Sequence, residues 1–185
     1  MEGGIHAWKG MVAAGPPDAG VAYFPPESTP LELSALAWLL ENGTGKFYRV
    51  VSSNLKDPEA VKIFQDLAGA EERHKETLFK GYLALAGKSE DPKFPGAAIS
   101  HQAGMDYMEG GVGVKKALEW AKEKNPEEIV EYSLSLEINS YDLHLKMAER
   151  MKDPRSKEMF AIIAEEEKGH LNRLQELFVR LMIPK

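Results

Sequence analysis

The sequence contains no cysteine among its 185 residues. Disulfides, thiolate nucleophiles and Cys-ligated zinc or iron–sulfur sites are therefore excluded within this chain. Any metal bound by these side chains must be held by carboxylate oxygen and imidazole nitrogen. A chain of this length can still bury a hydrophobic core without covalent cross-links.

The sequence also lacks a long apolar run and an excess of positive charge. The first apolar segment, Leu33 to Leu40, is far shorter than the roughly 20 residues of a membrane helix. Residues 1–25 do not combine a basic start with an apolar block, as a secretory signal does. The net charge is −6, which disfavours nucleic acid as a main partner. We expect a cytoplasmic protein with neither nucleic acid nor membrane as partner.

Glycine and proline separate an N-terminal lead-in from the rest of the chain. Residues 1–28 predict an extended lead-in or linker, and residues 29–185 predict one helical domain. Thr29, Pro30 and Glu32 form a capping box that predicts a helix over about 30–54. Asp57-Pro58 repeats the start signal and opens a second helix that ends at Gly87.

The second half of the chain repeats this organisation after a long connection. Asn125-Pro126 opens a helix that reaches about Met151, and Asp153-Pro154 opens another that runs almost to Pro184. The connection shows mixed polarity and at most short helical pieces, of which Val114 to Lys124 is one candidate. No segment predicts a convincing strand. We therefore expect an all-α fold, a four-helix bundle of two antiparallel helix pairs joined by a long crossover.

An internal repeat relates the two helix pairs. A shift of 96 positions aligns identical residues: Glu41 with Glu137, Asp57-Pro58 with Asp153-Pro154, Phe64 with Phe160, Ala68 with Ala164, Glu71 with Glu167, His74 with His170 and Leu78 with Leu174. Any two bundle helices can share the apolar matches. The polar matches are more informative, because amphipathic helices normally place glutamate on the solvent face.

The repeated polar residues are predicted to point into the core. Glu71 and His74 are three residues apart and share a helix face with apolar neighbours, as do Glu167 and His170. Buried carboxylates are costly unless a positive group pairs with them. No Lys or Arg lies on these stripes at the same depth. A pair of divalent metal ions is the simplest way to neutralise the cluster.

Two further glutamates complete the predicted metal site. Glu41 lies on an apolar stripe of the first helix, and Glu137 lies on the equivalent stripe of the third. One Glu from each of two helices plus Glu-x-x-His from each of the other two is the signature of ferritin-like di-iron carboxylate proteins. The paired motifs resemble the rubrerythrin and bacterioferritin superfamily. The 30-residue spacing between glutamates is most similar to the rubrerythrin-related ferritin-like proteins, over about residues 30–182.

The resemblance implies a role for each of the six residues at a site for two iron ions. Carried over by position, it implies bridging carboxylates at Glu71 and Glu167, terminal carboxylates at Glu41 and Glu137, and one imidazole per ion from His74 and His170. Such oxygen-rich coordination with one nitrogen per metal suits iron or manganese, and zinc can occupy the same ligands.

Three more side chains are candidates for a role beside the metals. Tyr48 follows Glu41 by seven residues, and His144 follows Glu137 by the same distance. Tyr141 lies one turn beyond Glu137. Each could orient a ligand or take part in redox chemistry, or could simply fill core volume.

Two departures from rubrerythrins limit what the resemblance implies. Rubrerythrins proper carry a Cys₄ iron domain that delivers electrons, whereas this chain has no cysteine. Its electrons must come from an unidentified donor. Rubrerythrins also have a second glutamate three residues from the first on the third helix, where this chain has Leu134 and Ser140 on either side of Glu137.

The lead-in carries a second resemblance. The segment from Gly3 to Lys9, Gly-Gly-Ile-His-Ala-Trp-Lys, is similar to the C-terminal end of rhodanese sulfurtransferase domains, and the stretch through Pro17 resembles a linker. This implies a fragment of a rhodanese–rubrerythrin-like fusion. The alternative is a Gly-rich, disordered N-terminus. His6 and His101 have no glutamate at the matching distance and are interpreted as loop residues.

Three classes of function remain open from the sequence. The first is a di-iron oxidoreductase that reduces hydrogen peroxide or O₂, of the kind associated with oxidative stress. The second is iron handling, through ferroxidase activity, storage or delivery. The third is a structural metal site in a bundle that docks on a partner or a rhodanese domain. We also expect a homodimer. Apolar residues of the crossover either cover the bundle or form a dimer surface: Met105, Tyr107, Met108 and Val112.

Overall fold

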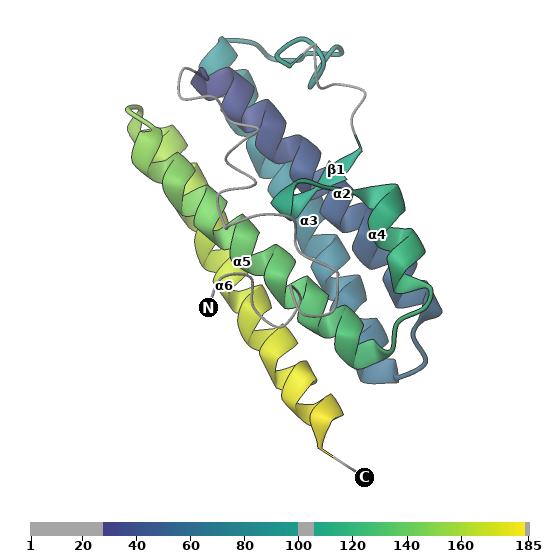
Figure 1. The fold of residues 1–185 in the computed structure, drawn as a ribbon. Helices are drawn as coiled ribbons and strands as arrows, with labels where there is room; N and C mark the ends of the chain where they lie inside the picture. The colour runs from purple at the N-terminus through teal and green to yellow at the C-terminus, as the bar shows by residue number, and fades with distance from the viewer. Residues whose placement is uncertain (1–27, 100–105, 184–185) are drawn as a thin grey trace.

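The computed structural model describes residues 28–99 and 106–183 (Figure 1). Its elements in chain order are α2 (Pro30–Asn54), α3 (Pro58–Ala86), β1 (Tyr107–Met108), the 3-10 turn η3 (Glu109–Gly111), β2 (Val112–Gly113), α4 (Val114–Ala121), α5 (Pro126–Arg150) and α6 (Pro154–Met182). The four long helices confirm the predicted all-α bundle. The rhodanese-like segment, His6, His101 and Met105 lie outside the described residues.

The helices begin where the capping signals predict. The Thr29 hydroxyl accepts a hydrogen bond from the Glu32 backbone at 3.2 Å, and the Glu32 carboxylate accepts one from the Thr29 backbone at 2.7 Å. Asn125 forms the same capping box at the start of α5. Asp57 and Asp153 cap α3 and α6 with their side chains. Each cap satisfies backbone N–H groups that the first helical turn leaves without partners.

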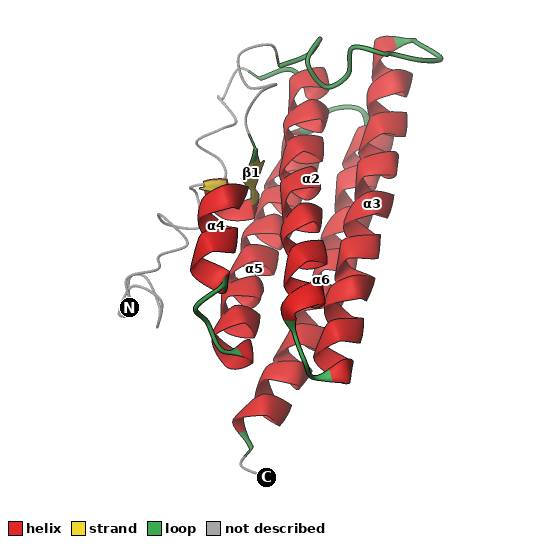
Figure 2. Cartoon of the chain, turned by 90° about the vertical axis from the view of Figure 1, so that its right-hand side faces the viewer, coloured by secondary structure: helices red, strands yellow, loops and turns green. Residues whose placement is uncertain are grey.

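The four long helices form two pairs. Helix α2 packs along α3 and α5 packs along α6, while α3 and α6 join the pairs. Figure 2 shows α4 beside α2, and the C-terminal end of α6 projecting beyond the other helices. Arg180 ties this end to the start of α3 through Asp57 at 2.6 Å and Glu59 at 3.0 Å. None of the described helices combines the length and apolar character that a membrane span requires.

The buried core is divided along the helix axes. One apolar cluster includes Phe47 and Phe64, and the other includes Leu33 and Phe160. On each long helix the buried glutamates and histidines of the repeat lie between the residues of these two clusters, whereas His144 lies among those of the second cluster. The polar groups are therefore closed off from solvent at both ends by packed apolar side chains.

The crossover differs from the expectation that it contains no strand. Tyr107 pairs with Gly113 and Met108 with Val112 in a two-residue antiparallel ribbon. Strands this short have no periodicity that a sequence could display. Met108 is fully buried and Val112 is 7% exposed, so these two residues cover the bundle. The helical piece predicted over 114–124 is α4, which ends at Ala121.

Candidate metal centre

The structure brings the six predicted site residues together between the two apolar clusters. They form two overlapping groups whose ligand atoms lie within 4.8 Å of one another: Glu41, Glu71, His74 and Glu167 in one, and Glu71, Glu137, Glu167 and His170 in the other. All six side chains are buried. Glu71 and Glu167 belong to both groups, which is the arrangement that two ions with shared carboxylates require.

Both repeated histidines turn Nδ1 toward the carboxylates. In His74 this nitrogen lies 3.2 Å from Oε1 of Glu167 and 3.4 Å from Oε2 of Glu41. In His170 it lies 3.0 Å from Oε2 of Glu167 and 3.1 Å from Oε2 of Glu137. The two rings stack with centroids 5.6 Å apart. Each imidazole therefore presents one nitrogen to one of the two groups.

The outer nitrogens of the two histidines have different surroundings. Nε2 of His74 lies 3.0 Å from Oε2 of Glu166, a side chain that is 46% exposed. In the repeat, the position equivalent to Glu166 is Ala70, so His170 has no such carboxylate from the matching position. A carboxylate on the outer nitrogen orients a ligating imidazole and raises its basicity. The two halves of the site are therefore not equivalent.

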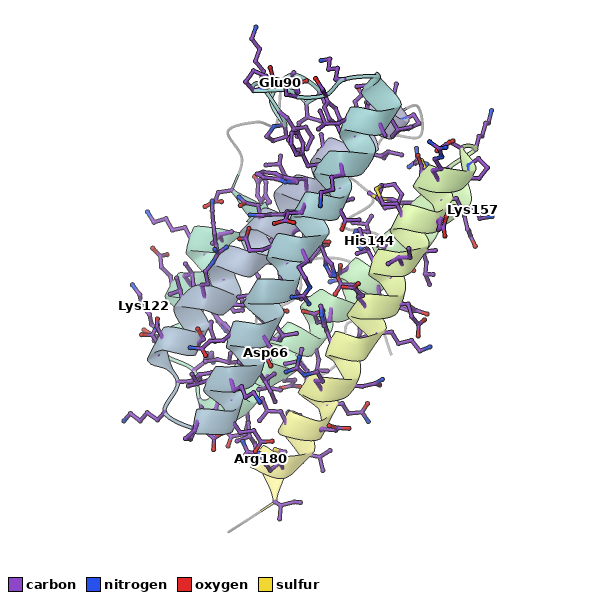
Figure 3. The ribbon with its side chains drawn as sticks, turned by 180° about the vertical axis from the view of Figure 1, so that it is seen from behind. Asp66, Glu90, Lys122, His144, Lys157 and Arg180 are labelled. Atoms are coloured by element: carbon purple, nitrogen blue, oxygen red, sulfur yellow. The ribbon has the colours of Figure 1, made fainter. Side chains whose placement is uncertain are left out.

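Tyr48 and His144 connect the two halves of the repeat. The Tyr48 hydroxyl donates a hydrogen bond to Oε1 of Glu137, and Nε2 of His144 lies 3.3 Å from Oε1 of Glu41. Both side chains are fully buried, and Figure 3 places His144 between the helices. Tyr141 is half-buried, and within the described residues no hydrogen bond joins it to the cluster.

The surroundings of His144 make Nε2 an acceptor. Nδ1 lies 3.0 Å from the Ser140 carbonyl, which can only accept, so this nitrogen carries the proton. Burial lowers the pKa of His144 to about 4, which keeps the ring neutral near pH 7. Nε2 therefore carries no proton, and its lone pair faces an oxygen of Glu41.

Sequence reasoning missed a fifth buried carboxylate, Glu109, in the crossover. Its side chain is 1% exposed, and neither carboxylate oxygen has a hydrogen-bond partner in the described part of the chain. Its backbone N–H donates to Oγ1 of Thr44 at 3.1 Å. Burial, and the carboxylates of Glu41 and Glu167 after it, raise the pKa of Glu109 well above its usual range. The available signal was an acidic residue between Met108 and two glycines.

The carboxylates and imidazoles strongly perturb one another. Burial, followed by the neighbouring carboxylates, raises the pKa of Glu71 and of Glu137 well above the ordinary value. Burial also acts to raise the pKa of Glu167, but hydrogen bonds from His170 and His74 hold it well below the ordinary value. Burial alone would lower the pKa of His170, yet the facing Glu137 and Glu167 carboxylates raise it to about 11.

The cluster has more acceptors than donors, which fits bound cations. Several buried acceptor atoms have no hydrogen-bond partner within the described residues: Oε1 of Glu41, Oε2 of Glu71, both carboxylate oxygens of Glu109 and Nε2 of His144. No Lys or Arg is among the buried residues that the structure describes. Since buried carboxylates need a positive counterpart, the residues present suit two divalent ions with oxygen-rich coordination and one nitrogen each.

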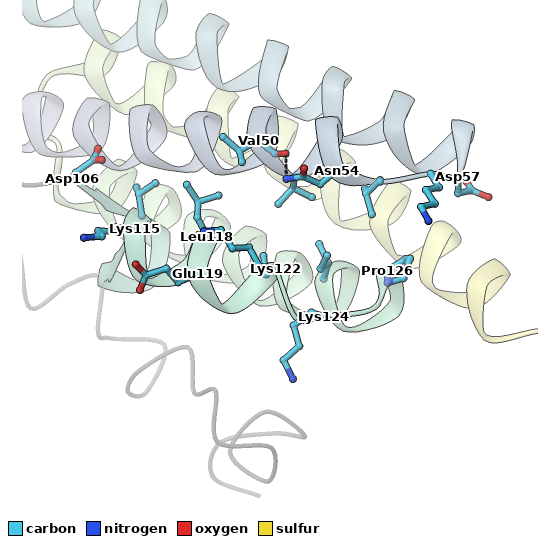
Figure 4. A pocket seen from close by; sticks show the side chains of 16 residues that line it. Val50, Asn54, Asp57, Asp106, Lys115, Leu118, Glu119, Lys122, Lys124 and Pro126 are labelled. Carbon is cyan, nitrogen blue, oxygen red and sulfur yellow. Dashed lines mark hydrogen bonds between the residues drawn. The ribbon is translucent and has the colours of Figure 1, made fainter.

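A surface groove lies apart from this cluster. It has a volume of about 950 Å³ between the C-terminal half of α2, α4 and the start of α5 (Figure 4). Its walls are apolar at Val50 and Leu118, and lysines such as Lys115 and Lys122 line its edge. None of the cluster residues lines the groove.

Comparison with known proteins agrees with the geometry. The rubrerythrin family model matches residues 33–178. No curated protein shows significant sequence similarity to the chain. A solved structure of a hypothetical protein from Pyrococcus furiosus has a similar fold, with a TM-score of 0.65 at 17% identity, covering 86% of this chain and 94% of that one. The extent of the family match and the buried Glu and His cluster together indicate a dinuclear metal site. The chain belongs to the rubrerythrin family of the ferritin-like di-iron superfamily.

Proposed function

We propose that the chain binds a pair of iron ions and uses them to reduce hydrogen peroxide. The observation that carries this proposal is the pair of overlapping ligand groups that share Glu71 and Glu167. In this assignment Glu71 and Glu167 would be shared by the two ions, Glu41 and His74 would help to hold one ion, and Glu137 and His170 would help to hold the other. Manganese or zinc would fit the same donors, but zinc would leave the site without redox chemistry.

The reaction needs two electrons and two protons for each peroxide. When bound in the reduced state, the iron pair supplies the electrons as each Fe(II) becomes Fe(III), according to H₂O₂ + 2 e⁻ + 2 H⁺ → 2 H₂O. The protein must therefore hold protons beside the site and exclude bulk water. The apolar clusters on either side of the carboxylates provide that exclusion.

The Tyr48 hydroxyl is positioned to hold one of these protons. It donates to Oε1 of Glu137, and burial, followed by the negative charge of Glu137, raises the pKa of Tyr48 well above its ordinary value. The proton therefore stays on the phenol until charge changes at the neighbouring carboxylate. Neutral His144 beside Glu41 cannot supply a proton from Nε2, so the two halves of the site differ in this respect.

The electrons must come from a redox centre outside these 185 residues. No cysteine is present in the 185 residues, so this chain has no Cys-ligated iron site of its own to accept and pass on electrons. We propose a one-electron carrier as the donor.

Stopped-flow absorbance tests this function. Protein loaded anaerobically with two Fe(II) per chain is mixed in parallel with hydrogen peroxide and with O₂. We expect oxidation by peroxide to be at least about 100-fold faster than by O₂. Faster reaction with O₂ would replace the proposal with ferroxidase chemistry, and oxidation no faster than that of free Fe(II) would indicate a structural metal site.

A matched pair of variants controls for metal binding on the same helix. Glu71→Gln removes the charge of a shared carboxylate, whereas Glu76→Gln changes an exposed side chain. We expect Glu71→Gln to lose at least one iron per chain and the rapid phase with peroxide. Glu76→Gln should retain both. Wild-type kinetics in Glu71→Gln at full iron occupancy would rule out this site as the reaction centre.

A further inference from the structure

The crossover hairpin places Glu109 toward the metal site. The ribbon of β1 and β2 is closed by the turn Glu109–Gly111, in which Gly110 and Gly111 have φ values of +73° and +72°. Residues other than glycine rarely adopt such φ values. The chain can therefore reverse direction within three residues. Glu109 occupies the first position of this turn, directly after the fully buried Met108.

Two contacts with α2 hold the hairpin against the bundle. The Thr44 hydroxyl accepts the hydrogen bond from the Glu109 backbone, as described above. A Cβ added at Gly43 would lie 2.0 Å from the Tyr107 carbonyl oxygen, so this helix position must be glycine for the chain to approach so closely. The backbone of Glu109 is thus docked on α2 within one turn of Glu41.

The carboxylate of Glu109 is surrounded by negative charge. The carboxylates that act on it come from all four long helices: Glu41, Glu167, Glu71 and Glu137. The imidazoles of His74 and His170 are already turned toward those same carboxylates through Nδ1. No Lys or Arg is among the buried residues that the structure describes. Glu109 therefore has no buried Lys or Arg among them as a counter-charge.

We propose that Glu109 is an additional carboxylate ligand of the dinuclear metal centre, supplied by the crossover rather than by the four-helix repeat. This inference rests on the metal site proposed above, and not on the reaction assigned to it. The residue 96 positions before Glu109 is Ala13, so the sequence repeat does not supply a second such carboxylate. Glu109 therefore makes the two ions of the pair inequivalent. Because Glu109 belongs to the hairpin, metal binding also stabilises the packing of the crossover against the bundle.

Cobalt(II) is a suitable probe, since its visible absorption reports the number and geometry of its ligands. The full chain is titrated with Co(II) in competition with a chelator, and spectra are recorded for wild type, Glu109→Gln and the control Glu119→Gln in α4. We expect wild type to bind two ions. Glu109→Gln should bind one of them at least about tenfold more weakly, with an altered visible spectrum and unchanged far-UV circular dichroism. Glu119→Gln should match wild type.

Hydrogen exchange of the wild-type chain provides a readout that needs no variant. We expect Co(II) to slow amide exchange over residues 107–114, and we expect this protection to be reduced in Glu109→Gln. If that variant loses its helical structure, Glu109→Asp, which keeps the charge one methylene shorter, should still alter the spectrum.

The outcomes separate the two proposals. Two ions bound by wild type and Glu109→Gln with equal affinity and identical spectra would overturn the role of Glu109 while leaving the centre intact. Unchanged exchange over 107–114 on Co(II) binding would also overturn it. Failure of wild type to bind two ions would overturn the centre itself.

Discussion

Individual side chains distinguish the two halves of a cluster whose carboxylates and imidazoles come from a repeat. His74 has Glu166 on its outer nitrogen, whereas the position equivalent to Glu166 for His170 is Ala70. Tyr48 donates to Glu137, whereas its counterpart His144 faces Glu41 with a lone pair. The repeat therefore supplies two similar groups of carboxylates and imidazoles, and these neighbours give each group a different polar environment.

Glu166→Gln tests the asymmetry of the histidines. The substitution removes the charge beside Nε2 of His74 while preserving the size of the side chain. Partners of this kind typically contribute about tenfold or more to metal affinity, so we expect one of the two ions to bind about tenfold more weakly in a chelator competition. Glu165→Gln, at an exposed position paired with Lys168, is the control. Equal weakening of both ions would show that Glu166 does not act through His74.

Tyr48→Phe tests the bond between the two halves of the repeat. Removing the hydroxyl leaves Oε1 of Glu137 buried without this donor, and a buried polar group that loses its partner costs about 1–3 kcal/mol. We expect the free energy of unfolding of the metal-free protein, measured by urea denaturation, to fall by about that amount. Tyr141→Phe is the matched control and should change it by less than about 0.5 kcal/mol. A smaller loss for Tyr48→Phe than for this control would contradict the prediction.

At the scale of elements, the crossover hairpin is an addition to the repeated helix pairs. In the second pair, Ser140 donates to Oε1 of Glu167 at 2.8 Å. Its counterpart Thr44 instead accepts the backbone N–H of Glu109. The same position on the two equivalent helices thus orients a site carboxylate in one case and anchors the hairpin in the other.

Gly43→Ala tests the docking of the hairpin on α2. A methyl group there would clash with the Tyr107 carbonyl, and overpacking of this kind costs about 1–3 kcal/mol. We expect a loss of that size in the free energy of unfolding, together with faster amide exchange over residues 107–114. Gly169→Ala provides a contrast in α6, because no atom lies within 4 Å of the added Cβ. It should stabilise the protein by about 0.5–1 kcal/mol. Stabilisation by both substitutions would contradict the proposed close approach.

At the scale of the whole molecule, the buried cluster links folding to pH. His170 has a pKa of about 11 in the fold against an ordinary value of 6.5, so its charged form contributes stability that is fully present below about pH 6.5. That contribution is lost as the pH rises through about 11. The pKa values of Glu71 and Glu137 are also raised above their ordinary value of 4.5. The folded state again holds more protons than the unfolded state, so stability falls as the pH rises above about 4.5.

We therefore expect the melting temperature of the metal-free protein to fall by several degrees between pH 6.5 and 9, as measured by scanning calorimetry. Zn(II) should reverse the trend, because binding displaces protons from the histidines and carboxylates and so becomes tighter as pH rises. Titration calorimetry in buffers of different ionisation enthalpy measures that proton release. Zinc affinity that does not change with pH would contradict the prediction.

The helices and the inward position of the six Glu and His residues could be predicted from the sequence because the information is local. Capping residues such as Thr29 mark the start of a helix within a few positions, and Glu71 and His74 share a face because of the helical period. The 96-residue repeat then shows that the same pattern occurs twice. Four amphipathic helices that each bury carboxylates can satisfy them only by meeting at a common centre.

The tertiary structure decided three features: the position of Glu109, the contact of Glu166 with His74, and the pairing of Tyr48 with Glu137. Glu109 lies in a loop without periodicity, and its burial depends on a hydrogen bond to Thr44, 65 positions earlier. Glu166 lies on the partly exposed face of α6 and meets His74 across 92 positions. Such contacts depend on how helices and loops pack against one another. The sequence alone therefore determined which carboxylates and imidazoles meet in the core, and the packing of the crossover and helix pairs determined how the two halves of that cluster differ.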